Sequence, residues 1–289
     1  MRTLLLLIAL GLFAAVDVAL AASARRLEIV RADDSVLKVA IFDRRAGAGD
    51  RALLLVQGSD CRRAEAHSWL SQALGGASVR WVVMVEKDGA ADSGDCGPVY
   101  ESHATEEARW FDHLVAMRRL KTELGLREKG AFQVLAVSAG GLTGCAMAGA
   151  SSDVGALALL GTGGGMTFDQ ELDKLTKGDA RLAAERRRIR TDPRLGKTWL
   201  GPTNPEIWWW SVLSKRCLPL LNGYSGPLLV VHGARDSSTP VESARTLVAG
   251  VSRPNVTYVE LDTDHDLGVT TLPPEQNGVA RVLAWLRTR

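Results

Sequence analysis

Ser138 lies in a sequence pattern that is typical of a nucleophilic serine. The stretch Leu135–Gly141 has the pattern of an apolar strand, a serine and then small residues that begin a helix. A nucleophilic serine at such a strand-to-helix turn needs small residues two positions before and two positions after it, because strand and helix approach closely. Ala136 and Gly140 meet this requirement. Ser138 is therefore the candidate nucleophile, and the alternative is a serine that only caps the following helix.

Two later residues could activate this serine. A serine hydroxyl attacks efficiently only when a histidine takes its proton and a carboxylate orients that histidine. After a turn of this kind the partners come in the order serine, acid, histidine. Asp236 lies just past the apolar strand 227–232, and His265 lies in the loop after the next strand. The pattern predicts His265 as the general base and Asp236 as the acid that orients it.

Each assignment has a competitor in the sequence. His232 is another candidate base, and His265 could be a surface histidine among acids. Three acids flank His265 and could replace Asp236: Asp262, Asp264 and Asp266. Residues adjacent in sequence rarely turn their side chains back onto the neighbouring histidine, which favours Asp236.

At these residues the chain resembles the α/β-hydrolase superfamily, over essentially its whole mature length. In that family the strand-end phrase His-Gly-x-x-Asp-x-x-x-Pro carries the triad acid, and residues 232–240 match it with Asp236. The resemblance likewise places His265 as the triad histidine. The family usually has Gly two residues before the nucleophile, where this chain has Ala136.

The resemblance also implies an oxyanion hole. One donor would be the backbone N–H of Ala139, the residue after the nucleophile. The other would come from the loop 57–60, where we expect the N–H of Ser59, with Gly58 as the next candidate. Esterases of the His-Gly-Gly-Gly type carry that sequence in this loop, and this chain does not.

The elements that must position these residues alternate between strands and helices. Such alternation predicts an α/β fold, with a mostly parallel central sheet and helices on both faces. An opening hairpin is expected at 27–30 and 37–42. Further strands are expected at 52–56, 79–85, 132–137, 154–160, 227–232 and 256–261, and helices at 64–74, 106–124, 139–150, 241–251 and 276–286.

The segment from about 166 to 222 interrupts this alternation. It contains a charged helical stretch, 169–190, then Pro193, Pro202 and Pro205, and the run Trp208–Trp210. It predicts a small helical insertion, which the resemblance implies is a lid. The tryptophans could face substrate or form the core of the lid, and the arginine run 186–188 predicts a solvated face.

The N-terminus has the pattern of a secretory signal peptide. A short cationic start precedes an apolar run, 4–16, and a small-x-small motif, 19–21. We expect cleavage after Ala21, or secondarily after Ala24, which would leave residues 22–289 as one domain without an integral membrane span. An uncleaved anchor is the alternative. The predicted location is periplasmic or secreted.

Export would place the four cysteines in an oxidising compartment, where thiols tend to pair. Cys61 and Cys96 each lie in a loop just beyond an apolar strand, so both could reach one edge of the sheet. We predict a Cys61–Cys96 disulfide. Cys145 could pair with Cys217 or remain a buried free thiol, and the sequence leaves both possibilities open.

Composition excludes several other classes of protein. A formal net charge of +2 is too balanced for dedicated nucleic-acid binding. His67, His103 and His113 lie on helix candidates without metal-ligand spacing, so no metal is expected and solvated or capping roles are favoured for them. The glycine-rich loop 161–165 lacks the spacing of nucleotide-binding loops, and no cofactor is expected.

These observations predict an exported serine hydrolase that cleaves a carboxylic ester, or a related small acyl substrate, through an acyl-enzyme. A peptidase or amidase using the same triad is one alternative. A periplasmic binding protein that keeps the fold without turnover is another.

Overall fold

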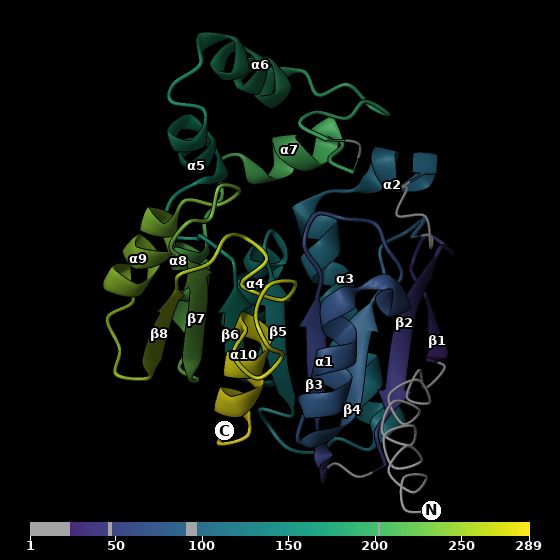
Figure 1. The fold of residues 1–289 in the computed structure, drawn as a ribbon. Coiled ribbons are helices and arrows are strands. Elements are labelled where there is room, and N and C mark those ends of the chain that lie inside the picture. Colours follow the sequence, from purple (N-terminus) through teal and green to yellow (C-terminus); the bar gives the residue numbers. More distant parts are fainter. Residues whose placement is uncertain (1–23, 46–47, 91–96, 202) are drawn as a thin grey trace, which may run out of the picture.

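The computed structural model describes residues 24–45, 48–90, 97–201 and 203–289. Within these ranges eight strands form one sheet in the order β1-β2-β4-β3-β5-β6-β7-β8 (Figure 1). The pairs β1·β2 and β2·β4 are antiparallel, and every later pair is parallel. The strands are β1 Arg25–Val30, β2 Val36–Asp43, β3 Ala48–Val56, β4 Val79–Val85, β5 Phe132–Val137, β6 Val154–Leu160, β7 Leu228–Gly233 and β8 Val256–Leu261.

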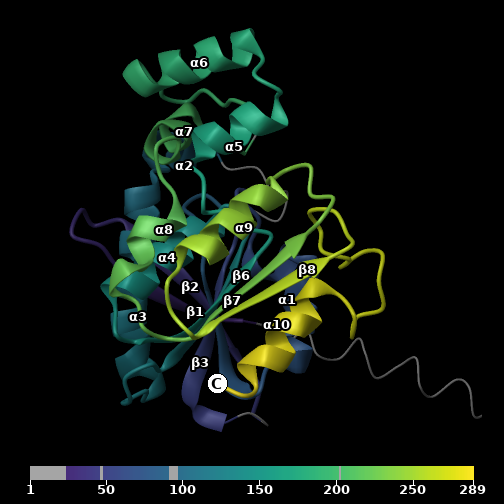
Figure 2. The ribbon, with the colours of Figure 1, turned by 90° about the vertical axis from the view of Figure 1, so that its left-hand side faces the viewer.

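Helices cover both faces of this sheet, as the alternating pattern predicts. On one face, α1 (Ser68–Gly76) packs against α10 (Gly278–Leu286); on the other, α3 (Glu106–Leu124) packs against α4 (Gly140–Ala150) (Figure 2). Helix α9 (Val241–Gly250) packs on β7. The predicted fold class is therefore confirmed.

The order of the strands explains where the predicted site residues meet. Strand β3 lies between β4 and β5. The chain therefore continues from β3 to its neighbour β4 on one side, and from β5 to its neighbour β6 on the other side. In open parallel sheets, ligands bind at the carboxyl ends of the strands where the order reverses in this way. Val56 is in register with Ala136, which brings the loop after β3 beside the turn that holds Ser138.

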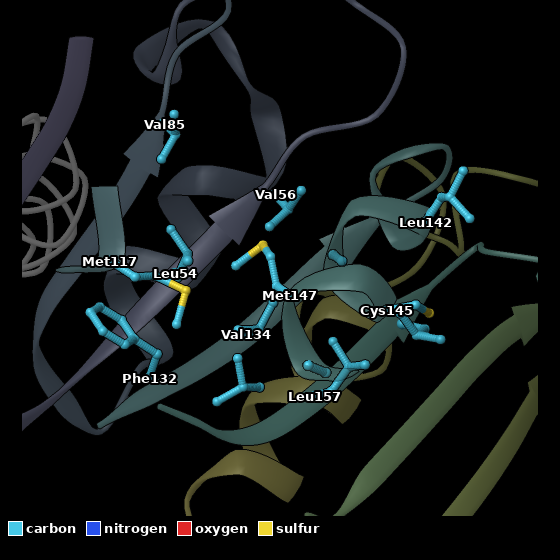
Figure 3. Close-up of a cluster of buried hydrophobic side chains, with 14 of the residues drawn as sticks. Leu54, Val56, Val85, Met117, Phe132, Val134, Leu142, Cys145, Met147 and Leu157 are labelled. Carbon is cyan, nitrogen blue, oxygen red and sulfur yellow. The ribbon is translucent and has the colours of Figure 1, made fainter. Parts of the chain in front are cut away.

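Helix α4 can lie close to the sheet because its residues are small. A β-carbon at Gly144 would press on Ala136, and one at Gly149 would collide with the carbonyl of Leu220. Figure 3 shows Met147 of α4 among side chains of β3 and β5 that include Val56 and Val134. Full burial of an apolar side chain of this size stabilises the fold by roughly 1.5–3 kcal/mol, so this helix is anchored firmly behind the turn.

The described residues between β6 and β7 form the α-helices α5 Phe168–Leu175, α6 Ala180–Thr191, α7 Glu206–Val212 and α8 Cys217–Leu220, and a 3-10 turn, Leu221–Gly223. Helices α5, α6 and α7 lie together at one end of the sheet (Figure 1). The predicted single helical stretch is two helices, because the chain turns at Lys177 and Gly178, which both have positive φ. The expectation of a solvated arginine run is also wrong at Arg186, which is buried and ion-paired with Asp169.

Other boundaries differ from expectation in small ways. The helix expected over 64–74 is a 3-10 turn, Ala64–Ala66, followed by α1. A further helix, α2 (Gly97–His103), precedes α3. Helix α3 begins after Thr105, whose hydroxyl accepts from the N–H of Ala108, and ends at Gly125 in the left-handed region, so its limits follow from its caps.

Candidate active site

Ser138 occupies a strained turn between β5 and α4. Its φ is 53°, in the left-handed region that non-glycine residues rarely adopt. Backbone bonds hold this conformation: the N–H of Ser138 donates to Leu160 at 2.8 Å, and its carbonyl accepts from Gly141 at 2.9 Å. The Thr162 hydroxyl donates to the same carbonyl at 2.9 Å. Backbone strain held in this way is typical of functional sites.

The small residue at position 140 is needed for this turn. A β-carbon at Gly140 would collide with the backbone carbonyls of Val56 and Gln57, at the end of the neighbouring strand. A larger residue would therefore push the start of α4 away from β3. The spacing seen in the sequence around Ser138 thus has a direct steric cause.

The three predicted triad residues meet at this turn. His265 Nε2 lies 3.0 Å from Ser138 Oγ. On the other side of the ring, His265 Nδ1 lies 2.7 Å from Asp236 Oδ2. A carboxylate in this position requires a proton on Nδ1, which leaves Nε2 free to accept the proton of the serine hydroxyl.

Asp236 is held as a carboxylate. Burial opposes its ionisation, but hydrogen bonds from His265 and from the backbone N–H groups of Thr239 and Ser238 outweigh it, so the pKa of Asp236 lies below its ordinary value. Both backbone bonds reach Oδ1 at 2.8 Å. The second oxygen is thereby left to His265.

The competing residues do not reach Ser138. His232 is fully buried, and its Nε2 donates to the carbonyl of Thr239 at 3.1 Å, although it also lies 3.3 Å from Asp236. The flanking acids bind their own surroundings: Asp262 pairs with Arg235, Asp264 accepts from the N–H of Asp266, and Asp266 accepts from those of Gly268 and Thr270.

The predicted oxyanion residues surround the serine. Ser59 and Ala139 line the same cavity as Ser138 and His265. Within the described residues, the backbone N–H groups of Ser59 and Ala139 have no hydrogen-bond acceptor. Gly58 packs on the serine itself, since a β-carbon there would approach Ser138 Cβ to 3.1 Å. Two donors without acceptors therefore border the cavity beside the hydroxyl.

The cavity has a volume of about 380 Å³, and the helical insertion forms much of its wall. Its apolar lining includes Leu142, Phe168, Leu172, Leu175, Leu200, Trp208 and Trp209. Trp208 and Trp209 also pack on each other, with ring centres 4.7 Å apart, whereas Trp210 is largely exposed. The two inner tryptophans thus belong both to the core of the insertion and to the cavity wall.

The sequence analysis missed two charged residues beside the site. Glu171 of α5 lines the cavity, and its Oε1 accepts from the Ser243 hydroxyl at 2.5 Å and the Gly164 N–H at 3.2 Å. Burial raises the pKa of Glu171 to about 7, against the effect of these bonds. Lys87, just after β4, is buried and donates to the carbonyls of Gly58 and Asp60, at 2.6 Å each.

A disulfide joins Cys145 of α4 to Cys217 of α8, with Cα atoms 5.5 Å apart. This resolves one pair that the sequence left open. Cys217 also lines the cavity, so the bond ties the end of the insertion to the helix that follows Ser138. The predicted partner of Cys61, Cys96, lies outside the described residues, and the Cys61–Cys96 bond stays a prediction.

Neither His113 nor His67 is solvated, and the side chain of His103 is not among the described side chains. His113 is buried, and its Nδ1 bonds the carbonyl of Arg109 at 2.7 Å. His67 is buried at the start of α1, without a capping hydrogen bond from its side chain. Across the described ranges, no group of three or more His, Cys, Asp and Glu side chains could hold a metal ion. Nor does any helix in those ranges have the length and apolar character to cross a membrane.

Comparison with known proteins gives matches in fold. No protein-family model and no curated protein matches the sequence. Among solved structures, the Pyrococcus furiosus esterase Pf2001 has a TM-score of 0.65 at 17% identity, covering 92% of this chain and 91% of that one. Est1E from Butyrivibrio proteoclasticus has a TM-score of 0.58 at 13% identity, covering 91% and 98%.

A monoacylglycerol lipase from Paleococcus ferrophilus matches in the same way, with a TM-score of 0.60 at 17% identity over 87% of this chain and 98% of that one. Identities this low establish the architecture and leave the reaction to be argued from the site. The sheet order, the strand-to-helix turn and these likenesses together show that the chain has the α/β-hydrolase fold.

Proposed function

We propose that the protein is an exported serine hydrolase that cleaves carboxylic esters with an apolar acyl group. The observation that carries the proposal is the continuous chain of contacts from Asp236 through His265 to Ser138, at 2.7 and 3.0 Å. The apolar lining of the adjoining cavity supports an apolar acyl group. The esterases and the lipase among the structural neighbours support ester hydrolysis.

In this proposal Ser138 Oγ attacks the ester carbonyl carbon while its proton passes to His265 Nε2. The carbonyl oxygen becomes an oxyanion that the N–H groups of Ala139 and Ser59 stabilise. His265 then gives its proton to the departing alcohol oxygen as the carbon–oxygen bond breaks, which leaves an acyl-Ser138. Water, deprotonated by His265, repeats the sequence and releases the acid and free enzyme.

The first test concerns the nucleophile. A fluorophosphonate probe should label the protein, and Ser138→Ala should abolish labelling with little change in melting temperature, because one small side chain replaces another. Ser252→Ala, at an exposed position after α9, is the matched control and should label like the wild type. Labelling that survives in Ser138→Ala would exclude Ser138 as the nucleophile.

The second test concerns the substrate. Turnover of p-nitrophenyl esters of graded acyl length should exceed that of aminoacyl anilides, and should fall for the longest chains once the cavity is filled. Faster cleavage of the anilides would instead favour a peptidase or amidase. A protein that neither labels nor turns over any of these compounds would fit a binding role.

A further inference from the structure

The lysine behind the predicted oxyanion loop has an unusual environment. Lys87 Nζ donates to the carbonyls of Gly58 and Asp60, the two residues on either side of Ser59. The side chain is buried, and within the described residues it forms no salt bridge with a carboxylate. Burial without an ion-pair partner lowers the pKa of Lys87 to about 7, and the two carbonyl contacts offset only part of the lost solvation.

One of these contacts determines where a neighbouring N–H points. The Gly58 carbonyl and the Ser59 N–H belong to the same peptide group, and no described peptide bond is cis. In a trans peptide the C=O and N–H bonds point in opposite directions. Because Lys87 binds the carbonyl from one side, the Ser59 N–H is directed to the other side of the loop, and Ser59 lines the cavity that contains Ser138.

The contact of Lys87 with the Asp60 carbonyl prevents the loop from rotating about its contact with the Gly58 carbonyl. Asp60 is bound by the same ammonium, and the Gln57 side-chain amide also donates to the Asp60 carbonyl, at 3.1 Å. The loop 57–60 is therefore held on both sides of Ser59. The Lys87 ammonium also lies 5.3 Å from the centre of the Tyr100 ring, which leaves it little freedom to move.

The ammonium also affects the strength of the donor. A cation at a peptide oxygen polarises that peptide and makes its N–H a better donor, as in other cooperative hydrogen-bond chains. A transition-state oxyanion benefits from donors that are already oriented before the reaction, since no reorganisation is then required. Both orientation and polarisation act on the same N–H group.

We propose that Lys87 is a positioning residue that orients the Ser59 N–H toward the oxyanion by binding the Gly58 and Asp60 carbonyls from behind the loop. The proposal rests on the proposed function, because it assigns Lys87 a part in ester hydrolysis. Lys87 acts through the loop and does not itself contact the substrate.

The test compares Lys87→Met, which keeps the length of the side chain but removes its donors, with the wild type. The matched control is Lys121→Met, which removes a partly buried lysine near the end of α3 that is ion-paired with Asp153. Both are assayed for kcat and KM on a p-nitrophenyl ester, and for inhibition by a trifluoromethyl ketone, whose adduct with the serine carries an oxyanion.

A misdirected donor should cost less than a deleted one, so Lys87→Met should lower kcat by about 10- to 100-fold with KM changed less than about threefold. Inhibition by the ketone should weaken by a similar factor. Lys121→Met should match the wild type in every measurement.

If Lys87→Met does not fold, Lys87→Gln is assayed instead, since its amide can still donate to one of the carbonyls, and it should show a smaller loss in the same two measurements. An active variant with wild-type kcat and ketone inhibition overturns the role of Lys87 alone. So does a variant in which only KM rises. A wild-type protein inert toward esters and toward the fluorophosphonate probe overturns the proposed function and this role together.

Discussion

The carboxylate of Asp236 lies close to two histidines whose surroundings differ. His265 lies at the cavity with its second nitrogen on Ser138, whereas His232 is enclosed by backbone. Burial lowers the pKa of His232, so this ring stays neutral and adds no charge beside the site. In the proposed reaction, proton transfer is therefore assigned to His265, with Asp236 setting its tautomer.

The assignment of the acid predicts the effect of three substitutions. Asp236→Asn keeps the shape of the side chain but favours the wrong tautomer of His265, and the equivalent change in a serine protease lowers kcat about 10⁴-fold. We expect a large loss here at neutral pH. Asp264→Asn and Asp266→Asn remove only nearby charge and should cost less than about tenfold. Steady-state kinetics of the three variants measure this.

The flanking variants serve as controls for charge near the histidine. Asp266 also holds its own loop through the N–H groups of Gly268 and Thr270, so its melting temperature should be recorded with its kinetics. A severe loss at position 264 or 266 together with a mild one at 236 would transfer the role of the acid to the flanking residue.

Glu171 predicts a pH dependence of stability. In the folded protein its pKa is raised from 4.5 to about 7 by burial. At pH values between these two pKa values, the folded protein therefore keeps a proton on Glu171 that the unfolded chain has lost. The resulting stabilisation of the folded state is fully present below the lower pKa and is lost as pH rises through the higher one. Glu171→Gln removes the titration while keeping an oxygen for Ser243 and Gly164.

We expect the free energy of unfolding to fall between pH values of about 5 and 8 more steeply in the wild type than in Glu171→Gln, by on the order of 1–3 kcal/mol. Urea denaturation at the two pH values measures the difference. Glu242→Gln, at an exposed position on α9, should behave like the wild type. Equal pH dependence in the wild type and Glu171→Gln would contradict the prediction.

Lys87 and Glu171 show what sequence reasoning could not reach. Lys87 follows a strand within the polar stretch 86–88, a pattern typical of a solvated turn. It is buried because the loop after β3, helix α2 and helix α3 all close around it, and those contacts join residues distant in sequence. Ser138, Asp236 and His265, by contrast, could be predicted because each lies at a strand end with a recognisable local pattern.

Among the helices and strands, the buried strands and amphipathic helices were predictable because their apolar patterns are local. Strand β8 covers the residues expected, and α9 and α10 differ only at their ends. The insertion was less predictable. The turn at Lys177–Gly178 folds α6 back so that Arg186 pairs with Asp169 of α5, and a charged stretch carries no apolar period that would reveal this turn.

The Cys145–Cys217 disulfide connects two helices and predicts how they respond to reduction. It spans 72 residues of sequence, so its loss should cost about 4–5 kcal/mol of stability in the chain-entropy model. The Cys145→Ala, Cys217→Ala double variant should show this loss in chemical denaturation. Activity should fall as well, because α8 forms part of the cavity wall.

Reductant provides the control for this bond. It should lower the stability of the wild type, but should change the double variant only through any remaining disulfide. A double variant as stable as the oxidised wild type would show that packing between α4 and α8 suffices without the bond.

For the molecule as a whole, we predict that protein recovered from the periplasm starts at Ala22 and carries an oxidised Cys61–Cys96 pair. Mass spectrometry of a non-reduced digest should find the two cysteine peptides linked, and the N-terminal peptide should lack residues 1–21. A start at Ser23 or Arg25 would move the cleavage site, the latter to the position after Ala24. Free thiols at both cysteines would contradict the predicted pair.

The left-handed backbone conformation of Ser138 lowers the stability of the fold at the residue that the proposed activity requires. A non-glycine residue in that region costs roughly 1–2 kcal/mol, and glycine adopts it freely. Ser138→Gly should therefore fold as well as the wild type or better, while losing the hydroxyl on which the proposed reaction depends. Directed evolution for thermal tolerance alone would tolerate or even enrich that change, so a library built from this protein must be screened for turnover as well as for folding.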